Sequence, residues 1–410
     1  MKNFLKATVS AFAICIAALL CFLFYISNLL PDRYMIAEGE EFSIRSQLNV
    51  TASVENKDSL RQVLTQSGNT YQAQLKLFGS IPLKQVTVQV VDKQMVAACG
   101  SPFGIKMFTE GVMVVGLSDL DTQAGPINPA KEAGIRIGDV VMRINGKEVY
   151  SNEQVGDILE KSGGKPLKVN LKRKNTPMTV TLVPRRSGVS DEFKAGMWVR
   201  DSSAGIGTMT FYDPISGVFG GLGHAVCDVD TGEILPLMKG EAVQVDITGC
   251  VKGESGVPGE LQGNFYENGK LGNLYLNNET GIYGTLNSKI TPPVLIPIAF
   301  RQEVKASSAT ILTTLNGSTP QEYDIMIEKV NFGDTNPTKN MVIRITDPKL
   351  LAKTGGIVQG MSGSPILQDG KLIGAVTHVF VNDPTRGFGI FAENMYYSID
   401  NVENAMRMAS

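Results

Sequence analysis

From Met197 onward the chain is a series of short apolar segments separated by turns, with no long helical pattern before about residue 393. GIGTMTFYD, AVQVDITGC, VLIPIAF, YDIMIEKV and MVIRITD are examples. Short apolar runs bounded by turn residues are typical of strands in sandwiches and barrels. The 43 glycines among 410 residues exceed the usual share of about 7% and suit many turns. We therefore predict a β-barrel or sandwich for this part of the chain.

The N-terminus is the second strong constraint. Lys2 and Lys6 precede an uncharged run from Ala7 to Pro31 that is rich in Phe, Leu, Ile and Ala. Such a run is long enough to span a bilayer, and the preceding positive charges place the N-terminus in the cytoplasm. We expect a signal anchor over residues 7–31, with the rest of the chain extracytoplasmic. A cleaved signal peptide and a lipid-modified Cys21 are the alternatives.

Composition narrows the classes of function. Lys and Arg total 38 against 40 Asp and Glu, so no basic field favours nucleic acid. With two histidines and no CxxC, the sequence predicts neither a metal nor another cofactor. Outside the apolar run lie Cys99, Cys227 and Cys250. The alternatives are a Cys227–Cys250 disulfide in an oxidising compartment and three small buried thiols.

A PDZ-like pattern occupies residues 101–186. GIRIGDVVMRINGKEV begins at Gly134, and its Asn145-Gly146 pair is a strong hairpin signal. NEQVGDILEKSG, which follows at Asn152, has apolar residues at helical spacing. Together these segments resemble PDZ domains of the bacterial protease type. Such domains bind a peptide as an added strand, and the resemblance places the ligand groove at Gly104, Ile105, Lys106 and Met107.

The segment GMSGSP, residues 360–365, presents two serines within a glycine-rich turn. A serine nucleophile needs a tight turn that exposes its hydroxyl and nearby N–H groups that stabilise an oxyanion. Glycine permits the dihedral angles that bring the N–H groups of Gly360 and Ser362 together. Ser364 precedes a proline, which favours extended backbone there. We therefore predict Ser362 as the nucleophile, in a motif that resembles chymotrypsin-like proteases.

A serine protease needs a general base, which is usually a histidine, and the chain has only two histidines. His224, in GGLGHAV, lies N-terminal to the serine, as in the His-Asp-Ser chain order. His378 follows Ser362 by 16 residues (378 − 362), on the strand that should form a wall of the substrate cleft. We expect His224 to be the base, and Thr377 and His378 to line the cleft.

The third member of a triad is the least constrained by sequence. Asp347 follows an alternating strand in RITDPKLL, 15 residues before Ser362 (362 − 347). Asp228, Asp230 and Asp246 are rivals by position alone.

A wider resemblance covers essentially the whole chain. FGGLGHAV and GGIVQGMSGSPILQDGKLIGAVTHVFVNDPTRGFGIFAENM, with the anchor and the PDZ pattern, are similar to the stage IV sporulation protein B peptidases of endospore-forming bacteria. The resemblance implies a triad of His224, Asp347 and Ser362. It also implies a signalling protease in the space between the two forespore membranes. That protease cleaves itself near its N-terminus. It then cleaves a regulatory subunit of an intramembrane protease that processes a late sigma factor.

The predicted fold is mainly β: an N-terminal transmembrane helix, a PDZ domain and a chymotrypsin-like double β-barrel. The predicted units are the anchor at 1–33, a juxtamembrane region with the self-cleavage segment at 34–100, the PDZ domain at 101–186 and the peptidase at 187–410. Self-cleavage is expected between Pro31 and Asn69, where polar backbone is accessible. The predicted function is a membrane-anchored serine endopeptidase. The alternatives are a PDZ-containing scaffold on an inactive protease fold and an esterase, which the missing α/β alternation disfavours.

Overall fold

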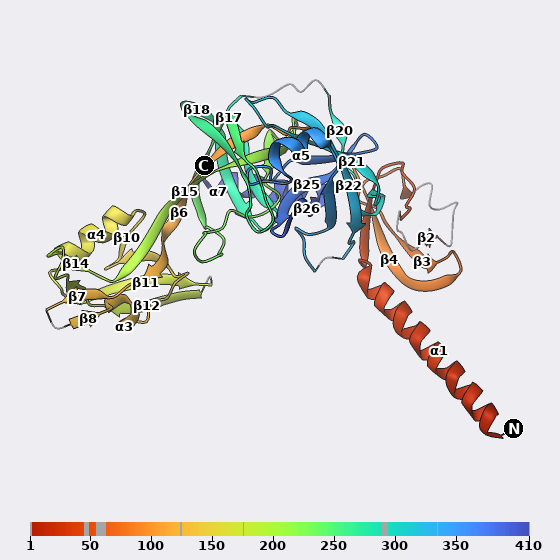
Figure 1. The fold of residues 1–410 in the computed structure, drawn as a ribbon, viewed down its shortest axis with the longest axis horizontal. Helices are drawn as coiled ribbons and strands as arrows, with labels where there is room; N and C mark the ends of the chain where they lie inside the picture. Colours follow the sequence, from red (N-terminus) through yellow and green to blue (C-terminus); the bar gives the residue numbers. More distant parts are fainter. Residues whose placement is uncertain are drawn as a thin grey trace.

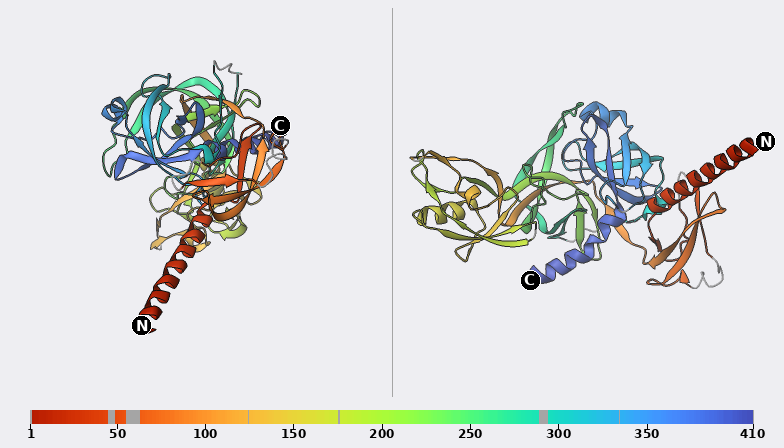
Figure 2. Two further views of the ribbon diagram at one scale, coloured as in Figure 1. Left: turned by 90° about the vertical axis from the view of Figure 1, so that its right-hand side faces the viewer. Right: turned by 90° about the horizontal axis from the view of Figure 1, so that it is seen from below.

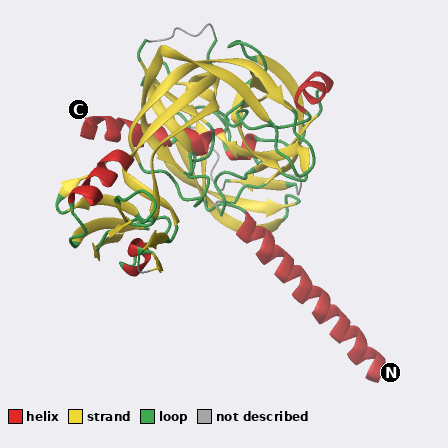
Figure 3. Ribbon diagram, turned by 60° about the vertical axis from the view of Figure 1, so that its left-hand side comes forward, coloured by secondary structure: helices red, strands yellow, loops and turns green. Residues whose placement is uncertain are grey.

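The computed structural model describes residues 2–44, 49–54, 63–123, 125–174, 176–288, 294–333 and 335–409. Its parts lie in a row, with a helix and a small sheet at one end, two barrels in the middle and a PDZ-like unit at the other end (Figure 1). Strands predominate throughout (Figure 3). The predicted mainly β fold with an N-terminal helix is therefore confirmed.

The N-terminal helix α1 (Lys2–Leu29) extends away from the rest of the molecule (Figure 2). Its segment Thr8–Leu29 has a mean hydropathy of 2.6 and is almost entirely exposed, so it is long and apolar enough to cross a membrane. Its C-terminal end packs, because Ile26 and the adjoining Leu30 belong to a hydrophobic core with the strands that follow.

A four-stranded sheet follows the helix in the order β1-β4-β3-β2. Its strands are β1 (Arg33–Ala37), β2 (Val50–Ser53), β3 (Thr70–Leu77) and β4 (Ile81–Val91). The alternating burial of β3 and β4 follows the alternating sequence and directs one face of the sheet to the core. The predicted self-cleavage segment includes residues 45–48 and 55–62, which lie outside the described residues.

The first barrel is a ring of six strands, β6-β17-β18-β19-β16-β15, that closes because β6 also pairs with β15. The ring comprises β6 (Pro102–Leu117), β15 (Met197–Tyr212), β16 (Val218–Gly221), β17 (Leu237–Val251), β18 (Glu260–Asn278) and β19 (Gly281–Leu286). Beyond β15 the sheet continues through β5 (Met95–Ala98) to β20 (Ile296–Pro297). One strand of this barrel therefore comes from the segment predicted as PDZ.

The second barrel is closed by six further strands in the order β21-β22-β23-β26-β25-β24. They are β21 (Ser308–Thr313), β22 (Gln321–Val330), β23 (Met341–Ile345), β24 (Pro365–Gln368), β25 (Lys371–Phe380) and β26 (Asp383–Phe391). Helix α5 (Pro348–Thr354) lies between β23 and β24, and α6 (Ala392–Tyr396) and α7 (Ser398–Ala409) end the chain. Two adjacent six-stranded barrels confirm the predicted double-barrel architecture.

The PDZ-like unit contains the C-terminal half of β6, then β9 (Val140–Ile144), β11 (Leu167–Arg173) and β12 (Thr176–Leu182), with helices α3 (Pro129–Glu132) and α4 (Asn152–Lys161). Asn145 and Gly146, with φ of 51° and 79°, form the predicted hairpin turn before β10 (Lys147–Glu148). Short ribbons β7 (Leu120–Thr122), β8 (Gly125–Ile127), β13 (Arg185–Arg186) and β14 (Phe193–Lys194) complete this unit.

The predicted ligand groove at Gly104, Ile105, Lys106 and Met107 is not an open strand edge in the structure. All four residues lie in the barrel half of β6, where they pair with residues 203–206 of β15 on one side and residues 240–243 of β17 on the other. A peptide cannot add there as a strand, since both edges are already hydrogen-bonded.

The cysteines form no disulfide: Cys227 and Cys250 are both free. The Cys227–Cys250 alternative is therefore not realised. Cys227 is exposed, so the alternative of three buried thiols is wrong as well. Burial raises the pKa of the Cys99 thiol to about 12, which keeps it protonated.

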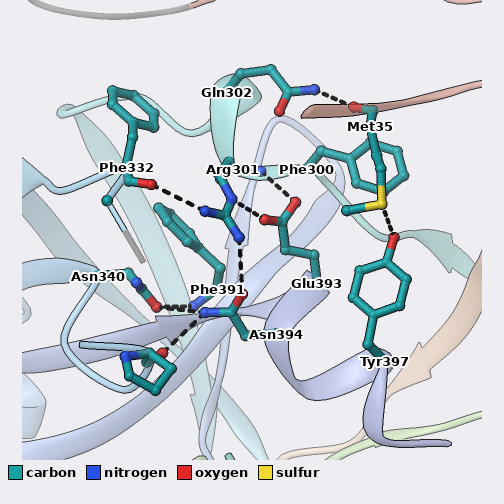
Figure 4. Close-up of polar contacts among 12 residues, drawn as sticks. Met35, Phe300, Arg301, Gln302, Phe332, Asn340, Phe391, Glu393, Asn394 and Tyr397 are labelled. Atoms are coloured by element: carbon teal, nitrogen blue, oxygen red, sulfur yellow. Dashed lines mark hydrogen bonds and ion pairs between the residues drawn. The ribbon is translucent and has the colours of Figure 1, made fainter. Parts of the chain in front are cut away.

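A buried ion pair joins the second barrel, the C-terminal helices and the N-terminal sheet (Figure 4). The Arg301 side chain pairs with Glu393, whose side chain is 1% exposed, and also donates to the Phe332 carbonyl at 3.1 Å. The neighbouring Gln302 donates to the carbonyl of Met35 in β1. The same short segment, η1 (Arg301–Glu303), thus holds the N-terminal sheet against the barrel.

Removing one partner of this ion pair should destabilise the molecule strongly. Glu393→Gln keeps the shape of the side chain but removes the charge of a carboxylate that pairs with Arg301 and is 1% exposed. Breaking a buried ion pair in this way typically costs about 3–5 kcal/mol. We expect the urea midpoint of the full-length protein in detergent to fall accordingly. The matched control is Glu148→Gln, whose pair with Arg143 is half-exposed on both sides, and there the midpoint should not change. Equal midpoints for both variants would contradict the structural role of Glu393.

Candidate active site

An open pocket of about 460 Å³ lies where the two barrels meet. The first barrel contributes His224, from the turn after β16, and the second contributes Ser362, from the turn before β24. Thr377 and His378 of β25 and the backbone of Gly360 also line it. The structure thus brings five of the sequence-predicted site residues to one place.

The turn that carries Ser362 is held by strand β15. The Thr208 hydroxyl donates to the Gly360 carbonyl at 2.8 Å, and the Thr208 N–H donates to the Ser362 carbonyl at 3.0 Å. Gly360 and Gly363 have φ of +95° and +94°, which glycine adopts without strain. Two hydrogen bonds from one buried threonine therefore fix the carbonyl of Gly360, before Ser362, and the carbonyl of Ser362 itself.

Gly363 lies where the serine turn packs directly against the backbone of the first barrel. A Cβ on Gly363 would lie 2.0 Å from the Thr208 carbonyl oxygen and 2.5 Å from the Leu222 backbone nitrogen. Any larger side chain would force the serine turn away from the histidine turn. The sequence requirement for glycine after Ser362 is therefore a packing requirement as well as a conformational one.

Two N–H groups at this turn are available to an oxyanion. Within the part of the chain that the structure describes, neither the Gly360 nor the Ser362 N–H has a hydrogen-bond acceptor. The neighbouring Met361, Gly363 and Ser364 N–H groups all donate to backbone carbonyls. Unpaired donors beside a half-buried serine are the arrangement that stabilises developing negative charge in acyl transfer.

The two serines of the motif have different environments. Ser362 is half-buried in the pocket, and its hydroxyl donates to the Thr377 carbonyl at 2.8 Å. Ser364 is fully buried, and its hydroxyl has no partner among the described residues. Only Ser362 can be reached by a substrate.

His224 is held in one tautomer by its own backbone. Its Nδ1 lies 2.8 Å from the Ala225 carbonyl oxygen, which can only accept a hydrogen bond, so Nδ1 carries the proton and Nε2 is left with its lone pair. Leu222 before it has φ of +67°, an uncommon conformation for a residue with a side chain. Burial lowers the pKa of His224, so the neutral, basic form persists below its ordinary range.

His378 lies against His224, with ring centroids 4.9 Å apart. Burial is the main cause that lowers the pKa of His378 to about 4, and the neighbouring His224 and Lys339 lower it further. Its Nδ1 is buried without a partner among the described residues. His378 is therefore neutral at physiological pH and forms part of the pocket wall.

The structure does not bring Asp347 to this pocket. Asp347 is the N-cap of α5, where its carboxylate accepts hydrogen bonds from the Lys349 and Leu350 N–H groups at 2.8 and 3.0 Å. The rival aspartates are also engaged elsewhere: Asp228 and Asp230 pair with Arg200, and Asp246 accepts from Tyr266. The position beside His224 Nδ1 is occupied by the Ala225 carbonyl instead.

Some residues of the site have only weak sequence signals. Thr208 is one of two threonines at alternate positions of the apolar segment GIGTMTFYD. Alternate residues of a strand face the same side, and this spacing was the available sequence signal for Thr208. The Ala225 carbonyl holds the His224 ring, and Leu222 has an uncommon backbone conformation. Both features depend on tertiary packing, so they cannot be predicted from a sequence pattern.

Two family models match the chain. A family model described as SpoIVB peptidase S55 matches residues 191–396, and a PDZ domain model matches residues 105–183. No curated protein matches the chain. Among solved structures, the Rv3671c protease of M. tuberculosis in its active form is 15% identical, covering 49% of this chain and 74% of that one, with a TM-score of 0.28. Its inactive form is 12% identical, covering 48% and 84%, with a TM-score of 0.28.

The fold and the family match together define a serine peptidase that carries a PDZ domain. The family match extends over half of the chain and includes both His224 and Ser362. The chain belongs to the SpoIVB peptidase S55 family.

The lowered pKa of His378 predicts a loss of stability in acid. Its folded-state pKa of about 4 lies below the ordinary 6.5, so between these values the unfolded chain binds a proton that the folded chain does not. The contribution of neutral His378 to the free energy of unfolding is complete above pH 6.5 and is lost as the pH falls toward 4. In His378→Asn this contribution is absent, so the drop in thermal midpoint between pH 7 and pH 4.5 should be smaller than in wild type. An identical drop in the thermal midpoint of wild type and of His378→Asn would contradict the lowered pKa of His378.

Proposed function

We propose that this serine peptidase is a membrane-anchored endopeptidase in which Ser362 is the nucleophile and His224 the general base. The observation that supports this proposal is that these two side chains share one pocket with the Gly360 and Ser362 N–H groups, which have no acceptor among the described residues. The N-terminal helix would anchor the chain, and the lysines before it favour an extracytoplasmic catalytic part.

The chemistry follows from the positions of these groups. The Ser362 hydroxyl turns from the Thr377 carbonyl to His224 Nε2, which takes its proton as the oxygen attacks the scissile carbonyl. The N–H groups of Gly360 and Ser362 receive the resulting oxyanion. His224, now protonated, returns the proton to the leaving amine, and water repeats the sequence on the acyl-enzyme. The released Thr377 carbonyl becomes available to a substrate N–H.

The biological role that we propose rests on the family. The chain would act in sporulation, in the space between the forespore membranes, by cleaving itself and a regulatory membrane protein. That protein would control an intramembrane protease that processes a late sigma factor. The PDZ unit would bind a peptide ligand and select these partners.

The nucleophile can be identified by labelling the full-length protein in detergent with a fluorophosphonate probe. Ser362→Ala and His224→Ala should abolish labelling and self-cleavage, since loss of a triad member typically costs on the order of 10⁴–10⁶ in rate. Ser364→Ala is the matched control. It removes a buried hydroxyl that has no partner and should keep both activities.

Other outcomes of this experiment point to other functions. Labelling that persists in Ser362→Ala would refute the proposed nucleophile. A wild-type protein that binds a PDZ ligand but neither labels nor cleaves would favour a scaffold on an inactive protease fold. Turnover of esters without any turnover of peptides would favour an esterase.

Asp347→Asn tests the orienting role that the family resemblance implies for Asp347. Asparagine caps helices as well as aspartate does, so the substitution should leave α5 and the thermal midpoint unchanged while removing the charge. If Asp347 orients His224 in the active protease, as we propose, kcat should fall by about 10⁴. A loss below about tenfold would leave the Ala225 carbonyl as the orienting group and refute the role of Asp347.

A further inference from the structure

Residues 226–235 form a loop that begins directly after Ala225, whose carbonyl orients the His224 ring. The side chain of Asn277 in β18 donates to one carbonyl at each end of this loop, at 2.9 Å in both cases. The first barrel therefore holds the two ends of the loop. The stretch between these ends needs support of its own if the Ala225 carbonyl is to stay at the ring.

Asp228 organises this loop from within. Its side chain is fully buried, and one carboxylate oxygen accepts from the Asp230 N–H at 3.1 Å and from the Thr231 N–H at 2.9 Å. Its main-chain N–H donates to the Glu233 carbonyl at 2.9 Å, and its carbonyl accepts from the Gly232 N–H at 2.8 Å. An aspartate that bonds the backbone two and three residues further on fixes a turn, so Asp228 sets the shape of the loop.

The charge of Asp228 is balanced by Arg200, which lies outside the loop. The Arg200 guanidinium pairs with the other carboxylate oxygen of Asp228 and, at 2.8 Å, with the carboxylate of Asp230. Among the described residues no other cation pairs with Asp228. Removing one partner of a buried ion pair is strongly unfavourable, so the loop depends on Arg200 for its conformation.

Arg200 also fixes the loop to the strands that connect the PDZ-like unit and the first barrel. It lies in β15 opposite Met113 of β6, which itself pairs with Val140 of β9. The same position receives a second contact from the loop, because the Thr231 hydroxyl donates to the Met113 sulfur at 3.8 Å. The loop is thus held against the β6–β15 pair at its tip as well as against β18 at its ends.

We infer that Arg200 and Asp228 are positioning residues for His224. Their ion pair holds the loop, and the loop keeps the Ala225 carbonyl at His224 Nδ1, so that the lone pair stays on Nε2. The inference rests on the proposed role of His224 as the general base. Neither Arg200 nor Asp228 is among the described residues that line the pocket, so both act through the loop and not on the substrate.

The test follows the rate of fluorophosphonate labelling of the full-length protein in detergent. In this reaction Ser362 attacks the phosphorus, fluoride leaves, and the base takes the serine proton. Arg200→Gln and Asp228→Asn should lower the maximal labelling rate about 10- to 100-fold, since a misplacement of about 1 Å can cost roughly 10² in rate. The half-saturating probe concentration and the final extent of labelling should stay as in wild type.

Arg200→Lys is the conservative variant. It keeps a positive charge beside Asp228, but its single nitrogen cannot replace the two guanidinium nitrogens that pair with Asp228 and Asp230. Its labelling rate should therefore lie between the rates of wild type and Arg200→Gln. This variant also decides the question if the other two do not fold, because a rate equal to that of wild type would then overturn the inference.

A second measurement reports on the His224 ring directly. The chain has only two histidines, so after labelling of histidine with ¹⁵N the Nδ1–H of His224 can be assigned by its absence in His224→Ala. This signal should shift or disappear in folded Arg200→Gln and Asp228→Asn, as the hydrogen bond to the Ala225 carbonyl is lost. A role in stability alone would leave the signal of the folded protein unchanged.

Arg143→Gln is the matched control, because Arg143 pairs with Glu148 on the surface of the PDZ-like unit and both side chains are half-exposed. It should change neither the labelling rate nor the His224 signal. A wild-type rate or an unchanged His224 signal in the folded Arg200 and Asp228 variants would overturn the inference while labelling of Ser362 persists. A wild-type protein that does not label at Ser362 would instead overturn the proposed function, and this inference with it.

Discussion

The antiparallel pairing of β6 with β15 is the interaction on which the rest of the structure depends. The ladder runs from Leu117 opposite Met197, in the PDZ-like unit, to Pro102 opposite Thr208, beside the turn that carries Ser362. It closes the first barrel, connects the PDZ-like unit to that barrel (Figure 1), and positions the threonine that holds the serine turn. One pair of strands thereby sets both the shape of the molecule and the orientation of the peptide groups at its active site.

The active site itself is made where two irregular turns pack against each other. Gly363 allows the serine turn to approach the backbone of Leu222, and Gly223 allows the histidine turn to approach Thr377 of β25, since a Cβ there would lie 2.9 Å from the Thr377 methyl group. Neither barrel holds a complete site. The relative placement of the barrels, rather than either fold alone, brings His224 and Ser362 to one pocket.

Features encoded locally were predictable from the sequence. The alternating strands, the Asn145-Gly146 hairpin, helix α4 and the glycine turn around Ser362 each depend on residues within a few positions of one another. The partners of β6 were not predictable, because both halves of this strand have similar buried patterns on either side of Glu110. The first half of β6 joins the barrel through β17, which is 128 residues away at the pair Thr109 and Leu237 (237 − 109). The second half joins the PDZ-like sheet through β9, which is 27 residues away at the pair Met113 and Val140 (140 − 113). The expected peptide groove at Gly104–Met107 is lost because β15 and β17 pair with both edges of the first half.

Helix α1 is connected to the two barrels by hydrogen bonds as well as by the chain itself. Helix α1 leads into β1, which lies parallel to β4 over five residues and is bonded to the second barrel through Met35. A peptide bond broken between β1 and β4 would therefore leave the two barrels attached to α1 by a ladder of hydrogen bonds. Release of the barrels from α1 would then require strand β1 to be withdrawn from the sheet, so that hydrolysis and release would be separate events with separate rates.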